Sequence, residues 1–153
     1  MKVIIVGSGS ATPDPERGNP SQAVIVDDEI LLFDCGERTS VNLVKAGINP
    51  IDVDYLFFTH LHIDHTADYK YFIYTTWNCG RKKLLKVYGP GSTEVITGTK
   101  EMTEIILNEE RKIMKMYNEK YVSPKVPVSN RPPLEYPMEL KEIGEGRIFQ
   151  GNK

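Results

Sequence analysis

The chain has little of several features that mark common classes of protein. It holds only two cysteines, Cys35 and Cys79, without Cys-x-x-Cys spacing, which argues against a disulfide framework or a zinc knuckle. No apolar run approaches the roughly 20 residues that cross a bilayer, and the run at 2–6 is too short for the core of a signal peptide. Charge of one sign is not in excess, since 19 basic and 21 acidic residues give a net charge of −2. We therefore expect a cytoplasmic globular protein whose surface as a whole is not built to bind nucleic acid or a membrane.

One short basic stretch departs from this even distribution of charge. Arg81-Lys82-Lys83 is followed closely by Lys86. Such a cluster is usually a solvated loop, and we interpret it as one rather than as a nucleic-acid site.

The 153 residues are predicted to form a single domain, residues 1–153, in which strands and helices alternate. Strand patterns occur at residues 2–6, Ser21–Val26, 30–34, 53–58, 84–88, Met138–Ile143 and 147–149. Helices are expected at 37–46, which ends before Gly47, and from 66 to 77. Residues 123–137 hold five prolines and are predicted to be a Pro-rich loop.

A third and longer helix is predicted from an N-cap at Ser92 to about residue 117. Its apolar residues recur at helical spacing, which is typical of one buried face. These residues are Met102, Ile105, Ile106, Ile113 and Met116. We interpret them as a stripe that faces the core and not as a cofactor site.

The strongest chemical signal is the run His60-Leu61-His62-Ile63-Asp64-His65, which contains all three histidines of the protein. It follows the apolar strand pattern at 53–58, so it lies at the carboxyl end of a strand, where open α/β sheets place their ligands. Imidazole nitrogens and carboxylate oxygens both suit zinc. His60 and His62 can converge on one metal from a tight turn, while Asp64 and His65 point to a neighbouring site. Two such metals can share a hydroxide that attacks an ester or a phosphodiester.

A second acidic residue, Asp34, ends the predicted strand at 30–34 and is followed by Cys35-Gly36. Aspartates at strand ends often orient a metal-bound histidine through its second ring nitrogen. The alternative is a turn or helix N-cap residue, and the sequence by itself leaves the two roles equally open.

These motifs together resemble the metallo-β-lactamase superfamily, and within it the branch that contains ribonuclease Z, the tRNA 3′-processing endonuclease, and arylsulfatase-like hydrolases. The resemblance rests on four segments. They are Val6-Gly7-Ser8-Gly9-Ser10-Ala11-Thr12-Pro13, Leu32-Phe33-Asp34-Cys35-Gly36-Glu37, Phe58-Thr59-His60-Leu61-His62-Ile63-Asp64-His65 and Val87-Tyr88-Gly89-Pro90. Ribonuclease Z usually has glycine where this chain has Ile63, and the following Thr66-Ala67-Asp68-Tyr69 is more similar to the arylsulfatase-like relatives.

The resemblance implies an α/β fold of the αββα sandwich type, with a mixed sheet and helices on its outer face. It also implies a two-zinc site, although manganese or iron would suit the same ligands. His60 and His62 would bind the first metal, Asp64 and His65 the second, and Asp34 would lie behind the ligands. Asp64 would in addition orient the nucleophile or accept its proton.

Family members are usually about twice as long, and their remaining ligands lie in the second half. No histidine follows His65 in this chain, which therefore offers two ligands for each metal, whereas a catalytic zinc normally has three. The favoured hypothesis is the N-terminal half of a metal-dependent hydrolase that acts on a small ester, a sulfate ester or a phosphodiester, with tRNA among the candidate substrates. A homodimer of halves, in which Asp34 or Asp68 replaces the missing bridging carboxylate, is the second hypothesis. A non-catalytic metal-binding or interaction half-domain is the third.

Overall fold

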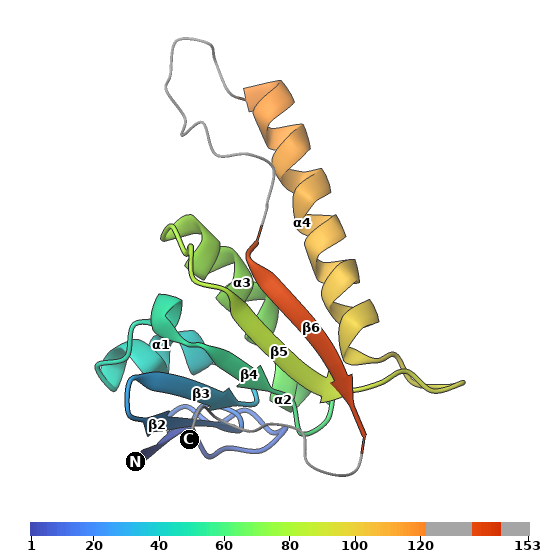
Figure 1. Ribbon diagram of the computed structural model, residues 1–153. Coiled ribbons are helices and arrows are strands. Elements are labelled where there is room, and N and C mark those ends of the chain that lie inside the picture. Colours follow the sequence, from blue (N-terminus) through green and yellow to red (C-terminus); the bar gives the residue numbers. More distant parts are fainter. Residues whose placement is uncertain (122–135, 145–153) are drawn as a thin grey trace.

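The computed structural model describes residues 1–121 and 136–144, with backbone only for 117–121. Its centre is a six-stranded mixed sheet (Figure 1) in the order β1-β2-β3-β4-β5-β6. The strands are β1 (Lys2–Gly7), β2 (Ser21–Val26), β3 (Glu29–Phe33), β4 (Tyr55–Phe57), β5 (Leu85–Pro90) and β6 (Met138–Ile143). The first three strands pair antiparallel, and β3 to β6 pair parallel. The predicted mixed sheet is therefore confirmed.

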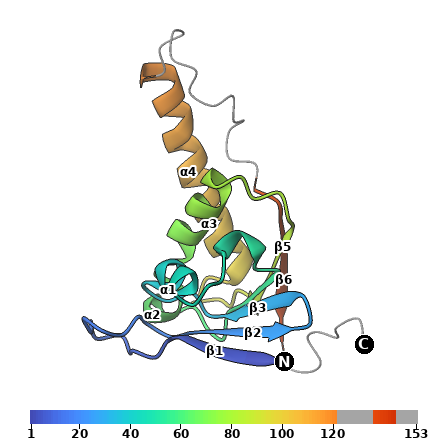
Figure 2. The same ribbon diagram turned by 90° about the vertical axis from the view of Figure 1, so that its left-hand side faces the viewer.

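The helices lie in the connections between strands. They are α1 (Thr39–Lys45), a 3-10 turn η1 (Pro50–Asp52), α2 (Ile63–Thr66), α3 (Tyr69–Asn78) and α4 (Thr99–Tyr121). From β3 onward each new parallel strand is added on the same side of the previous one. Because such crossovers are right-handed, all their helices must fall on one face of the sheet. Figure 2 shows this one-sided arrangement, with α1, α3 and α4 on the same side of the strands.

The main hydrophobic core lies between these helices and the sheet. Alternate strand residues point into it, including Leu32 on β3, Leu56 on β4 and Val87 on β5, each with none of its surface exposed. The helices contribute Leu43 from α1 and Phe72 from α3, which are equally buried. This packing fixes β3 and β4 side by side, and their carboxyl ends carry the predicted site.

The other face of the sheet carries a separate aromatic cluster. Phe57 stacks on Phe33 and on Tyr88, with 5.0 Å between ring centroids in both pairs. Tyr55 and the partly buried Leu31 and Ile143 complete the cluster, which therefore draws its described members from strands alone. We call this surface the aromatic face.

The long helix differs from its prediction in two ways. It begins at Thr99, because Ser92 serves the preceding loop, where its Oγ accepts a hydrogen bond of 2.8 Å from the Gly98 amide. The proposed apolar stripe is only partly in the core. Met102 and Ile106 pack against the core, whereas Ile105, Ile113 and Met116 are 58%, 44% and 48% exposed. The side of α4 that faces the core is marked instead by Thr103, Leu107 and Glu110, which are 0%, 8% and 7% exposed. Ile105, Ile113 and Met116 lie away from that side of the helix.

The basic stretch was interpreted as a solvated loop, which is right for Lys82 and Lys83 and wrong for Arg81. Arg81 is 5% exposed as a residue, and its guanidinium donates hydrogen bonds to backbone carbonyls of η1 and of Val53. Arg81 therefore joins the turn after α3 to the segment that enters β4, and it is a structural residue.

The bounds of two further predicted elements can be compared directly with those observed. Strand Ser21–Val26 is found with the predicted bounds, and the helix expected at 66–77 is divided into α2 and α3. No described helix is both long and apolar enough to cross a membrane. The strand expected at 147–149 and residues 123–135 of the Pro-rich loop lie outside the described residues.

Candidate metal centre

The histidine run lies where β4 leaves the sheet. The Phe58 amide still donates to the Tyr88 carbonyl of β5, at 2.8 Å, so the chain stays in register until the residue before Thr59. It then turns through His60, Leu61 and His62 and enters the one-turn helix α2, which holds Asp64 and His65. A strand end followed by a tight turn thus brings all three imidazoles to one edge of the sheet.

The three rings are close together. Ring centroids lie 4.0 Å apart for His60 and His65, and 4.7 Å apart for His60 and His62. Asp64 Oδ2 lies 3.6 Å from His65 Nε2, and both side chains are 17% exposed. The ligands expected from the sequence are therefore neighbours in space and accessible to solvent.

Asp34 lies directly behind this cluster, with its side chain 3% exposed. Its Oδ2 is 2.8 Å from His65 Nδ1. The Asp34 carboxylate also accepts hydrogen bonds from the Thr59 amide at 2.8 Å and from the Thr59 hydroxyl at 2.8 Å and 3.0 Å. Asp34 has a φ of 59°, a left-handed conformation that aspartate tolerates better than most residues and that is often found at functional sites.

Backbone contacts hold the Asp34 segment against the histidine run. The Cys35 amide donates to the His65 carbonyl at 2.8 Å, and the Asp68 amide donates to the Cys35 carbonyl at 3.0 Å. Gly36 follows, and any Cβ there would overlap the Asp64 carbonyl oxygen and lie 2.6 Å from Asn19 Cβ. The glycine is required because the two segments approach too closely for a side chain.

Two further polar residues are near the cluster but are already engaged. Burial raises the pKa of the Cys35 thiol well above its ordinary value, which disfavours the thiolate that a metal would need. The Asp68 carboxylate accepts hydrogen bonds from the Ser40 amide and hydroxyl on α1. Burial raises the pKa of Asp68, and the bonds from Ser40 act in the opposite direction. Both side chains therefore contact α1, Cys35 through Thr39 and Asp68 through Ser40.

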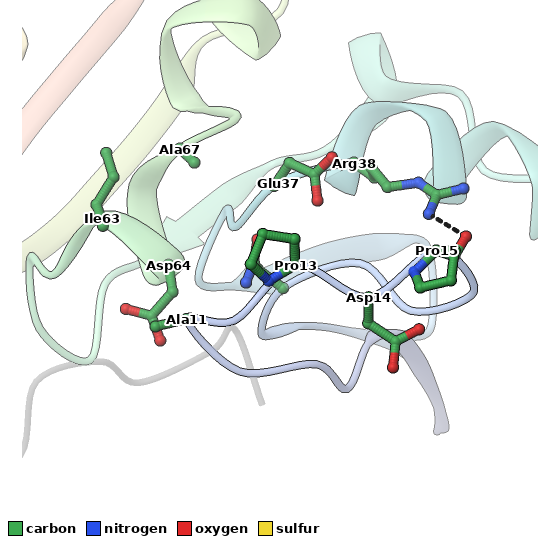
Figure 3. A pocket seen from close by; sticks show the side chains of 10 residues that line it. Ala11, Pro13, Asp14, Pro15, Glu37, Arg38, Ile63, Asp64 and Ala67 are labelled. Carbon is green, nitrogen blue, oxygen red and sulfur yellow. Dashed lines mark hydrogen bonds between the residues drawn. The ribbon is translucent and has the colours of Figure 1, made fainter.

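A pocket of about 640 Å³ opens beside Asp64 (Figure 3). Ile63, Asp64 and Ala67 line one side of it, and the side away from them is lined by Asp14, Pro15 and Arg38. The remaining lining residues are Ala11, Pro13, Asn19 and Glu37. The Arg38 guanidinium donates to the Pro15 carbonyl at 2.8 Å, which closes the far end. The pocket is thus a space next to a candidate metal ligand.

The donor types present fit a transition metal, since imidazole and carboxylate are the usual partners of zinc. Their number is smaller than a closed site requires. Within residues 1–116 and 136–144, no three His, Cys, Asp or Glu side chains are arranged so that they could hold one ion. The assignment of two ligands to each metal stays a prediction.

Thr59 is a site residue that the sequence reasoning did not single out. Its Oγ1 lies 3.1 Å from His60 Nδ1 and also contacts Asp34. The signal was its position directly before His60, but a threonine at a strand end usually reflects strand propensity. The contact with Asp34, 25 residues earlier, becomes visible only when β3 and β4 are paired.

Comparison with known proteins agrees with this geometry. A model of the metallo-beta-lactamase superfamily matches residues 16–143. A ribonuclease Z of Methanococcus maripaludis is 39% identical over 93 residues, which are 61% of this chain and 30% of the relative. A ribonuclease Z of Methanocaldococcus jannaschii is 29% identical over 124 residues, covering 80% of this chain and 39% of the relative. The chain thus spans about a third of the length of the curated relatives it matches.

Solved structures give the same fold. Human tRNase Z, short form, superposes with a TM-score of 0.62 at 28% identity over 74% of this chain and 41% of that chain. The metallo-beta-lactamase fold protein YhfI of Bacillus subtilis reaches a TM-score of 0.63 over 97% of this chain and 48% of that chain, and its 15% identity supports the fold alone. The coverage of less than half of each structure fits the expectation of an N-terminal half. On the family match over residues 16–143, the chain belongs to the metallo-β-lactamase superfamily.

Proposed function

We propose that this chain supplies the first half of the active site of a metal-dependent hydrolase similar to ribonuclease Z. The observation that carries the proposal is the convergence of His60, His62, Asp64 and His65 at the carboxyl end of β4. The ribonuclease Z relatives set out above support the same class of reaction. Hydrolysis of a phosphodiester in RNA, with tRNA as the candidate substrate, is the activity that we propose.

Each residue has a distinct role in this proposal. His60 and His62 hold one metal, and Asp64 with His65 holds a second. When bound, two zinc ions would supply an activated water and would offset negative charge on the ester. Asp64 is accessible at the pocket wall, where it can orient the nucleophile or accept its proton. Asp34 is buried and touches His65 Nδ1, so it orients that ring and does not meet substrate.

The proposed site is completed by residues that this chain does not contain. A catalytic zinc normally has three protein ligands, and the chain offers two for each metal. In an αββα sandwich the aromatic face would pack on a second sheet, and that second half would bring the missing ligands to the same edge. Single-domain organisation over 1–153 and a cytoplasmic location stay predictions.

The pocket bears on the choice of substrate. Asp14, Glu37 and Asp64 line it together with a single guanidinium, that of Arg38. Three carboxylates facing one cation do not favour a long polyanion in this particular space. A small sulfate ester or phosphodiester, as in the arylsulfatase-like branch, is therefore the second candidate substrate class, and RNA would have to approach the metals from another side.

Two measurements test the proposal. Metal analysis of the purified chain and of its His62→Ala and Asp64→Ala variants should show zinc, manganese or iron that decreases in both variants. Unchanged metal content in the variants would contradict the ligand assignment. Hydrolysis of a tRNA precursor, bis(p-nitrophenyl) phosphate and p-nitrophenyl sulfate should be negligible for the chain alone. Family-like rates from the 153-residue chain would show that its site is complete, and the half-site proposal would then be wrong.

A second candidate function is a non-catalytic metal-binding or interaction domain that associates with its own copies. The aromatic face favours it, because Val3 and Ile5 on the same face are 57% and 63% exposed and could pack in a homodimer. Sedimentation velocity separates the two candidates. A stable dimer without hydrolytic activity supports the second, whereas a monomer excludes a homodimer. The intact mass of the gene product from its native source would show whether 17.4 kDa is the natural size.

A further inference from the structure

Thr59 occupies a position between the buried carboxylate and the histidine run. Its amide donates to Asp34 Oδ1 at 2.8 Å, and its hydroxyl donates to Asp34 Oδ2 at 2.8 Å. The same hydroxyl oxygen lies 3.1 Å from His60 Nδ1. It also lies 3.4 Å from His65 Nδ1, a longer contact than the 2.8 Å between that nitrogen and Asp34. Thr59 Oγ1 thus contacts both Asp34 and His60.

The direction of each hydrogen bond follows from the number of protons available. A carboxylate accepts hydrogen bonds and has none to donate, and a hydroxyl has one proton and two lone pairs. The Thr59 proton goes to Asp34, because a bond to a carboxylate is about twice as strong as a bond between neutral groups. Toward His60 the Thr59 oxygen can then only accept, so His60 Nδ1 must carry the hydrogen.

The same reasoning applies directly to His65. Its Nδ1 lies 2.8 Å from Asp34 Oδ2, so Nδ1 donates and Nε2 is left with the lone pair. That Nε2 is the nitrogen that faces Asp64 Oδ2, at 3.6 Å. Asp34 therefore sets the tautomer of His65 by direct contact and that of His60 through one intervening hydroxyl.

We propose that Thr59 is a positioning residue that transmits the hydrogen-bonding preference of Asp34 to His60, and so holds both His60 and His65 with Nε2 free to bind metal. The tautomers follow from the hydrogen bonds alone. Only their use in binding metal rests on the proposed function. Threonine suits the task because its β-branched side chain is restricted at χ1, which keeps the hydroxyl between its two partners. The sequence separation of 25 residues between Asp34 and Thr59 is bridged by the pairing of β3 with β4.

The test is to determine the histidine tautomers in the metal-free chain. The protein has three histidines in total, so long-range ¹H–¹⁵N spectra of the chain with ¹⁵N-labelled histidine contain only three ring systems. Spectra are recorded after chelator treatment at about pH 8, above the ordinary histidine pKa. We expect Nδ1–H in both His60 and His65. His62 is an internal reference, since its ring nitrogens have no hydrogen bond within the described part of the chain. A protonated Nε2 in wild-type His60 overturns the proposal.

Variants distinguish transmission through Thr59 from a merely structural effect. In Thr59→Val the Nδ1–H form of His60 should decrease while that of His65 is retained, and Thr59→Ser should restore it. In Asp34→Asn both rings should change. The indole signal of Trp77, the only tryptophan and a buried one, reports whether each variant is folded. An unchanged His60 in folded Thr59→Val would refute the role of the hydroxyl.

Metal affinity gives a second readout that does not depend on hydrolysis. Loss of a group behind a metal ligand typically weakens metal binding about 10–100-fold. We expect that range for zinc on Thr59→Val, measured by competition with a chelator, and a smaller decrease on Thr59→Ser. Because the tautomers are measured without metal or substrate, the two proposals fail separately. Expected tautomers with no zinc binding would reject the metal site, and zinc binding with Nε2–H in His60 would reject the positioning role.

Discussion

The two faces of the sheet are made by the same strands and differ in what covers them. On one face Leu32, Leu56 and Val87 have no exposed surface, because helices α1, α3 and α4 pack over them. On the other face the described partners of Phe57 and Tyr88 all come from neighbouring strands. Alternation along each strand places an apolar residue on both faces, which is typical of strands that are buried on two sides. The second face is thus composed for burial without a described helix to provide it.

The difference follows from the connectivity of the strands. Doubly wound sheets place helices on both faces because their strand order reverses at a switch point. Here the order from β1 to β6 never reverses, so right-handed crossovers place the helices of residues 1–121 on the opposite side from the aromatic face. We therefore interpret the helix-covered face as the main part that stabilises the fold. On the aromatic face Tyr55, Phe57 and Tyr88 are also buried, so its β1 edge, where Val3 and Ile5 are 57% and 63% exposed, is the part that other structure would cover.

The largest expected change in unfolding free energy comes from comparing Leu31 and Leu32, neighbours on β3 that point to opposite faces of the sheet. Leu32→Ala removes a fully buried side chain from the helix-covered core and should cost about 2–5 kcal/mol of unfolding free energy. Leu31→Ala, on the aromatic face, should cost about 1 kcal/mol, since Leu31 is only partly buried. Urea unfolding monitored by Trp77 fluorescence measures both. Equal losses would mean that the two faces are equally sealed in this chain.

Beyond the end of β3 the chain lies on neither face of the sheet, and there Gly36 packs against the backbone of the candidate site. Gly36→Ala should cost about 1–3 kcal/mol, because the added methyl group would overlap the Asp64 carbonyl and push apart two tightly packed segments. It should also weaken zinc binding, since Asp64 must move. Gly91→Ala is the matched control, as its Cβ would meet Glu142 at an ordinary 3.6 Å. Similar stability and zinc affinity in both variants would contradict the close approach.

The sequence predicted the elements that depend on local pattern and predicted less well those that depend on tertiary contact. The HxHxDH spacing predicted the candidate site because it is a dense, specific pattern after an apolar strand. The strand-end position of Asp34 left two roles open, and only the family resemblance placed it behind the ligands, without indicating which histidine it contacts. Thr59 was missed, since its partner is 25 residues away. The prediction for α4 was wrong at Ile105, Ile113 and Met116, because apolar spacing alone did not show that the core side of the helix runs through Thr103, Leu107 and Glu110.

A surface substitution tests whether the aromatic face is an interface. Ile5→Lys, at a position 63% exposed on β1, should change the unfolding free energy by about 0.5 kcal/mol or less. It should nevertheless weaken any association with a second sheet or a second copy, because it places a charge in the contact. Val44→Lys on the helix side is also at a position 63% exposed and should leave association unchanged. Sedimentation velocity of both variants compares them, and equal behaviour would remove the aromatic face as the contact surface.

The smallest expected effect is a decrease of the unfolding free energy at alkaline pH, caused by Tyr55 on the aromatic face. Burial, followed by the hydrogen bond that the Tyr55 hydroxyl donates to Glu29 at 3.0 Å, raises the pKa of Tyr55 to about 12. Tyrosine in the unfolded chain titrates near 10. The unfolded state therefore loses the proton first, so the contribution of Tyr55 is complete below about pH 10 and is lost as pH rises through about 12. Against Tyr55→Phe, measured by urea unfolding from pH 8 to 12, wild type should lose stability more steeply above pH 10.

Glu29→Gln removes the charge but keeps an acceptor, and it should retain the larger part of the effect, because burial is the larger cause. Parallel curves for wild type and Tyr55→Phe would mean that water reaches this hydroxyl freely and that the aromatic face is open in the isolated chain.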